Sequence, residues 1–103
     1  MSDSELEISF DHDLERQTFD ALVGKRRATL EYRSNKEGKI FLTSTEVHPT
    51  LQGKGVEEKL VVHVLEYIRE NGMRLIPVCP VVKEFLKTHQ EYMDVVASGI
   101  RIN

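Results

Sequence analysis

The sequence contains a single cysteine, Cys79, so no intrachain disulfide can form. A chain without disulfides suits a reducing compartment, and we expect a cytoplasmic protein. No apolar run approaches the roughly 18 residues that a membrane-spanning helix requires, and the N-terminal stretch MSDSELEISF is acidic and lacks the basic and apolar parts of a secretory leader. We therefore expect no membrane partner.

Dense basic runs and metal-binding spacings are also absent. Lys25, Arg26 and Arg27 form the one basic triplet in a chain of net charge -3. We interpret this triplet as a solvated strand edge rather than a nucleic-acid site. Neither His-x-x-x-His nor Cys-x-x-Cys occurs, so we expect no metal site. What remains is an ordinary globular composition of 103 residues, 40% apolar and 30% charged, which predicts one domain over residues 1–103.

The first half of the chain alternates apolar and polar residues, as half-buried strands do. Strands are predicted over residues 5–10, 16–22, 27–33 and 39–47, with turns at 23–25 and 34–38. The last of these strands ends at His48-Pro49, where the missing amide hydrogen stops pairing. This half is therefore predicted to form an antiparallel meander.

The second half changes to a helical period. Apolar residues at 56, 60, 61, 64, 65 and 68 predict a helix that ends at Asn71-Gly72. A short strand over 73–79, a helix over about 80–88 that begins at Pro80, and a last strand over 92–96 are predicted to follow. A strand–helix–strand unit from 40 to 79 favours parallel pairing with a right-handed crossover.

The stretch HPTLQGKGVEEKL, residues 48–60, places Gly53 and Gly55 directly before the predicted helix. Free backbone N–H groups and the helix dipole make such a start a candidate phosphate site. The alternative is a tight turn that happens to precede a helix. The spacing matches neither a Walker A loop nor a dinucleotide fingerprint.

Several residues between 27 and 96 resemble those of GNAT-type N-acetyltransferases, in particular a small branch of about a hundred residues. Gln52, Gly55 and Glu57 occupy the positions of the acetyl-CoA motif of that superfamily, which carries Gly or Ala at the third. The run Pro77–Pro80 resembles a Pro-x-Cys-Pro motif of the small branch, and His89, Glu91 and Tyr92 fit its usual ending. Ser44 stands where that branch often carries histidine.

The resemblance implies an α/β fold with a mixed, mostly antiparallel sheet, two main helices and a splayed parallel strand pair that admits acetyl-CoA. It also implies transfer of the acetyl group to an amine acceptor, which the sequence does not identify; the oligomeric state stays open too. The residues that would hold acetyl-CoA are Val47, Gln52, Gly53, Lys54, Gly55, Val56, Glu57 and Glu58. The alternative is a non-catalytic module with this fold that binds CoA weakly, or another ligand or protein.

Glu57 departs from the small residue of the resembled motif, at a position that faces inward on the predicted helix. A carboxylate about 5 Å from a phosphate costs roughly 3 kcal/mol at an effective dielectric of about 20. We expect cofactor affinity weakened by roughly ten- to a hundred-fold. Alternatively, Glu57 and Glu58 serve only to stabilise the helix dipole.

Two catalytic routes stay open. Cys79 lies directly before a predicted helix start, where the dipole favours a thiolate that could accept the acetyl group; alternatively, it is a small buried core residue. In a direct route, Glu46 or His48 would take the proton of the amine. The alternative for these two residues is a solvated loop.

Overall fold

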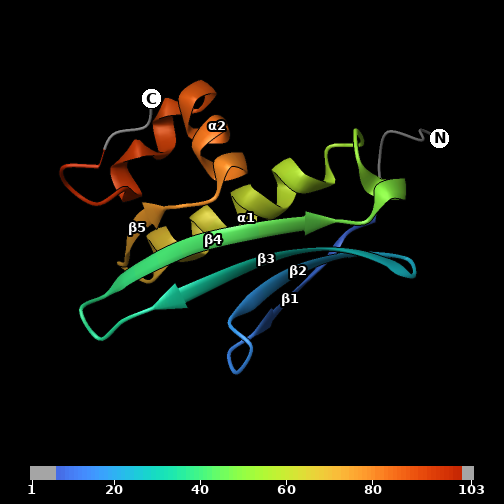
Figure 1. Cartoon of the computed structure of the whole chain (residues 1–103), viewed down its shortest axis with the longest axis horizontal. Coiled ribbons are helices and arrows are strands. Elements are labelled where there is room, and N and C mark those ends of the chain that lie inside the picture. Colours follow the sequence, from blue (N-terminus) through green and yellow to red (C-terminus); the bar gives the residue numbers. More distant parts are fainter. Residues whose placement is uncertain (1–6, 101–103) are drawn as a thin grey trace.

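The computed structural model describes residues 7–100. Its elements are β1 (Ser9–Asp13), β2 (Thr18–Val23), β3 (Arg26–Ser34), β4 (Lys39–Val47), the 3-10 helix η1 (Pro49–Leu51), α1 (Val56–Glu70), β5 (Arg74–Pro77), α2 (Pro80–Thr88) and the 3-10 helix η2 (Gln90–Val95). The strands form one sheet in the order β1-β2-β3-β4-β5. Among the strands described, β4 and β5 are the one pair that runs parallel, and both α-helices lie on one face of the sheet (Figure 1). The predicted mixed, mostly antiparallel sheet with two helices is confirmed.

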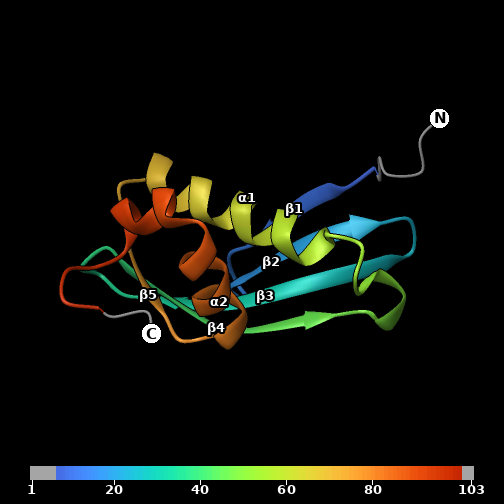
Figure 2. The same cartoon turned by 90° about the horizontal axis from the view of Figure 1, so that it is seen from above.

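The core lies between the helices and the inner face of the sheet. Figure 2 shows the helices over this face, where α1 contacts β2 and β3 while α2 contacts β4 and β5. The predicted apolar stripe of α1 is buried throughout: Val56, Leu60, Val61, Val64, Leu65 and Ile68. Each such side chain contributes about 1.5–3 kcal/mol on burial. This stripe fixes the rotation of α1 about its axis and therefore the direction in which its polar residues point.

The predicted N-terminal strand lies further along the chain. Residues 5 and 6 are outside the described residues, and β1 begins at Ser9 and continues to Asp13. As an edge strand, β1 pairs only with β2 in the described sheet, and Phe10 keeps 37% of its surface exposed rather than entering the core. Its ring stacks on His63 of α1, with centroids 4.2 Å apart. The other three strands of the meander agree with the prediction to within two residues at each end.

The C-terminal strand predicted over 92–96 is wrong. The chain forms η2 there, and only Val96 makes an isolated parallel bridge, with Leu75. The N–H of Ala97 donates to the carbonyl oxygen of Leu75 at 2.9 Å. Alternating apolar and polar residues predicted a strand with one face in solvent. In η2, however, the polar side chains of Tyr92 and Asp94 bind α1, which the alternation alone does not reveal.

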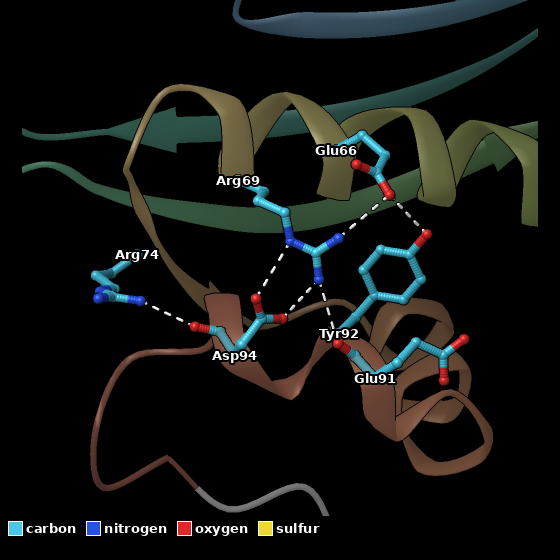
Figure 3. A network of polar contacts seen from close by, with 6 residues as sticks. All are labelled: Glu66, Arg69, Arg74, Glu91, Tyr92 and Asp94. Carbon is cyan, nitrogen blue, oxygen red and sulfur yellow. Dashed lines mark hydrogen bonds and ion pairs between the residues drawn. The ribbon is translucent and has the colours of Figure 1, made fainter.

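Arg69 of α1 holds η2 in place (Figure 3). Its guanidinium donates to both carboxylate oxygens of Asp94, at 2.7 and 3.2 Å, and to the carbonyl oxygen of Glu91 at 3.2 Å. The same group lies 5.0 Å from the ring centroid of Tyr92, whose hydroxyl donates to Glu66 at 2.9 Å. The hydrogen bonds from Arg69 lower the pKa of Asp94. This network replaces the strand pairing that the sequence suggested.

His12 of β1 lies in an aromatic cluster beneath α1. Its ring stacks on Phe19, with centroids 4.0 Å apart, and meets the edge of Tyr67 at 4.9 Å. Its Nε2 is hydrogen-bonded to the hydroxyl of Tyr32. The side chains packed against the imidazole of His12 are aromatic rings. Rings replace lost hydration poorly, so burial disfavours the charged form of this imidazole.

We predict a pH-dependent stability that originates at His12. Burial lowers its pKa, and His63 lowers it further, against weaker opposite effects of Asp13 and Asp11. The unfolded chain, with a histidine pKa of 6.5, therefore takes up this proton first as pH falls. The stabilisation is complete above that pKa and is lost as pH drops toward the lower folded value.

Urea unfolding between about pH 7 and pH 5 tests this prediction. We expect the free energy of unfolding to fall more steeply with decreasing pH in the wild type than in His12→Leu. Parallel curves for the two proteins would contradict it.

Candidate functional site

The chain between β4 and α1 makes two tight turns. After Val47 ends β4, His48 caps η1: its Nδ1 accepts a hydrogen bond from the N–H of Thr50 at 3.2 Å. This nitrogen of a predicted candidate base is therefore engaged within the loop. Gly53 and Gly55 then adopt left-handed backbone angles, with φ of 78° and 81°. Residues with a side chain adopt these angles only with strain.

The start of α1 is open. Gly55 is its N-cap, and no side chain caps the helix. A Cβ added at Gly53 or Gly55 would meet nothing within 4 Å, so the left-handed angle, and not crowding, demands glycine. The N–H groups of the first turn lack intrahelical acceptors and carry the positive end of the helix dipole. They face space that a ligand can enter.

A cleft of about 580 Å³ lies between β4 and this first turn. Its lining consists of Thr45, Val47, Leu51, Gln52, Gly53, Gly55, Glu57 and Glu58. Six of the eight residues predicted to hold acetyl-CoA thus surround one cleft. Lys54 and Val56 do not line it: Lys54 is exposed and Val56 is buried in the core. Gln52 ties the loop to β4, because its side-chain amide donates to the carbonyl oxygen of Val47 at 3.4 Å.

Two carboxylates, those of Glu57 and Glu58, line this cleft. Glu57 is half-buried and also lines a second cleft of about 360 Å³ between α1 and α2, together with Glu58 and Glu84. Among residues 7–100, no lysine or arginine lines either cleft. A phosphate placed here would be attracted by backbone N–H groups and repelled by Glu57.

The parallel pairing of β4 and β5 ends next to this cleft. β5 stops at Pro77, earlier than predicted, and the N–H groups of Val78 and Cys79 both donate to the carbonyl oxygen of Leu42, at 3.0 and 2.8 Å. Directly after Leu42, the pairing of β4 with β3 contains a bulge: Thr43 has no partner on β3, so the register between the two strands shifts there. β4 then continues to its end without β5 beside it. The predicted parallel pair is confirmed, and a gap beside β4 opens because β5 ends rather than because the paired strands diverge.

Cys79 occupies this gap beside β4. It is the N-cap of α2, as its place before Pro80 predicted, and only 2% of its surface is exposed. Its Sγ lies 3.0 Å from Oγ1 of Thr45, so the contact reaches from α2 back to β4. The sequence did not single out Thr45, because no local pattern brings it to a residue 34 positions away.

Glu46 does not approach Cys79. The bulge at Thr43 reverses the alternation of β4, so Thr45 and Val47 face the cleft while Glu46 points to the opposite face of the sheet. There it is exposed, in a shallow pocket with Thr29, its partner on β3.

The groups that could bind or react at the cleft are therefore the N–H groups of α1 and the hydroxyl of Thr45. The thiol of Cys79 does not line the cleft but lies buried directly behind this hydroxyl. Within residues 7–100, no group of three or more His, Cys, Asp or Glu side chains is arranged to hold a metal ion. None of the described helices is both long and apolar enough to cross a membrane.

The sequence and fold match known proteins. The model of the GCN5-related N-acetyltransferase family matches residues 18–95, which include the whole cleft. An NMR structure of a GCN5-like protein from Staphylococcus aureus, itself proposed to be an N-acetyltransferase, shares 30% sequence identity and a TM-score of 0.67, covering 94% of this chain and 91% of that one. No curated protein matches the sequence. The family model covers most of the chain and the whole cleft, so the chain belongs to the GCN5-related N-acetyltransferase family.

Proposed function

We propose that the protein is an acetyl-CoA-dependent N-acetyltransferase. In this proposal the diphosphate of CoA binds at the start of α1, and the acetyl thioester lies between β4 and Cys79. The observation that carries the proposal is the end of the β4–β5 pairing directly beside an uncapped helix start. An open helix N-terminus suits a diphosphate, and the gap beside β4 holds the only thiol of the chain, behind Thr45 of the cleft.

The free edge of β4 suits the arm of CoA between the diphosphate and the thioester. Beyond Thr43, no strand of the described chain pairs with β4 on the β5 side. Its unpaired backbone groups could bond the amides of this arm as a neighbouring strand would. Backbone N–H groups near Val47 would stabilise the thioester oxygen as it gains charge.

In the route we favour, the acetyl group passes through Cys79. The thiolate attacks the acetyl carbon, the bond from that carbon to the sulfur of CoA breaks, and CoA leaves as a thiolate that takes up a proton. An acceptor amine then attacks the new thioester, loses a proton and restores the thiolate. Thr45, 3.0 Å from the sulfur, would orient it.

The direct route, in which the amine attacks acetyl-CoA itself, needs a base beside the thioester. Glu46 is exposed on the other face of the sheet, and Nδ1 of His48 is engaged in its turn. Both placements support the route through Cys79.

A second candidate function is a non-catalytic module that binds CoA weakly, or another ligand or protein. Glu57 favours it, because its carboxylate lines the cleft where an anion would bind. The following experiments separate the two functions.

We predict that acetyl-CoA binds at the start of α1. Titration of ¹⁵N-labelled protein should shift the amide signals of residues 52–58 and of Thr45. Acetyl-pantetheine, which lacks the diphosphate, should leave Gly53 and Gly55 unshifted. The absence of any shift at about millimolar acetyl-CoA would contradict both the enzyme and the CoA-binding module.

We predict that Glu57→Gln strengthens acetyl-CoA binding by roughly ten- to a hundred-fold, because it removes the charge while keeping the shape. Isothermal titration measures the affinity. Glu70→Gln, at the far end of the same helix, is the matched control and should leave the affinity unchanged. An unaltered affinity in Glu57→Gln would show that its carboxylate does not oppose the ligand.

We predict that incubation with acetyl-CoA adds one acetyl group to Cys79, detected by mass spectrometry. Cys79→Ala should still bind acetyl-CoA but carry no acetyl group. Thr45→Val, which keeps the volume but loses the hydroxyl, should acquire it about tenfold more slowly, since one hydrogen bond orients the sulfur. An unmodified thiol in a protein that binds acetyl-CoA would exclude the relay and leave the direct route.

A further inference from the structure

A third cleft lies on the outward side of α1. It measures about 630 Å³, which is within the range of small-ligand sites. Phe10 of β1 forms one wall, Phe85 and His89 of α2 form the other, and Val62 and His63 of α1 form the floor. Its lining is mainly apolar, and a ring stack stands on either side: Phe10 on His63, and Phe85 on His89 with centroids 3.9 Å apart. We call it the outer groove.

The outer groove is continuous with the cleft beside β4. Gly55 and Glu58 line both. A ligand held by its diphosphate at the first turn of α1 can therefore extend over that turn and enter the groove without crossing the core. The two clefts together offer separate room for the two ends of a long ligand, one on each side of the helix start.

We call the cleft beside β4 and the cleft between α1 and α2 the inner clefts. The outer groove differs from both in the charge of its lining. Lys59 lines it, is exposed and forms no ion pair with any residue from 7 to 100. Two carboxylates also line the groove, and one of them, Glu66, already accepts hydrogen bonds from Arg69 and Tyr92 (Figure 3). The other, Glu58, is the acid of the lining that directly opposes an anion there. The ammonium of Lys59 therefore attracts a phosphate, whereas no cationic side chain among residues 7–100 lines the other two clefts.

We propose that the outer groove holds the adenosine end of CoA, with Lys59 binding its 3′-phosphate and the adenine packed on Val62 and the Phe85–His89 stack. This rests on the proposed function, since it requires the diphosphate to lie at the start of α1. An adenosine 3′-phosphate carries the two features that the groove matches: a flat ring for the aromatic wall and an anion for the free ammonium. Lys59 would then select CoA over its 3′-dephospho form.

Isothermal titration of the full chain with acetyl-CoA and with acetyl-3′-dephospho-CoA tests the proposal. The wild type should bind acetyl-CoA about two- to fivefold more tightly, which is the effect of one solvent-exposed charged contact. Lys59→Gln should bind both ligands equally, at the affinity of the wild type for the dephospho form. Lys36→Gln is the matched control: it removes the same charge from the turn between β3 and β4, outside every cleft at α1, and should keep the full preference.

Amide shifts provide a second readout. Acetyl-CoA should shift the signals of Val62 and His89, and acetyl-pantetheine should not. Equal affinity of the wild type for both ligands, or an unchanged preference in Lys59→Gln, overturns the proposal while leaving the proposed function intact. Binding of acetyl-CoA without shifts at Val62 and His89 overturns it too and leaves the groove to another occupant. If acetyl-CoA does not bind at all, the proposed function fails with it.

Discussion

The candidate site depends on one backbone carbonyl. The oxygen of Leu42 accepts hydrogen bonds from both Val78 and Cys79, which ends the parallel ladder while β4 still has five residues to run. Had β5 continued beside β4, the gap would be filled by backbone, and Cys79 would lie within a strand instead of capping α2. The bulge at Thr43 acts with this carbonyl, because it turns the hydroxyl of Thr45 toward the thiol.

α1 serves the core, the inner clefts and the outer groove at once. Its apolar stripe is fully buried, so the helix cannot rotate to move its charged residues. Glu57 is therefore fixed toward the inner clefts and Lys59 toward the outer groove. Acids in the first turn stabilise the helix by about 0.3–1 kcal/mol each, yet the same N–H groups are those that an anionic ligand needs. Helix stability and ligand affinity thus place opposite demands on Glu57.

The loop with Gly53 and Gly55 fits both interpretations of its sequence, a tight turn and a phosphate site. The turn requires Gly53 and Gly55 because their backbone angles are left-handed, as in a tight turn that has no ligand. The same turn leaves the space above them empty and the helix uncapped, which is the condition for an anion to approach. A tight turn and a phosphate site are therefore compatible here, and the acids that follow decide how tightly an anion is held.

The sequence by itself determined the strand and helix positions from 18 to 88, because apolar spacing and turn residues act locally. It also placed six predicted ligand-binding residues in one cleft, since they are adjacent in the chain. Only the tertiary structure decided the face on which Glu46 lies, the exposure of Phe10 on an edge strand, and the turn that replaced the last predicted strand. It alone brought Thr45 to Cys79. Each of these outcomes depends on strand register or on pairing between residues far apart in the chain, which a local pattern does not encode.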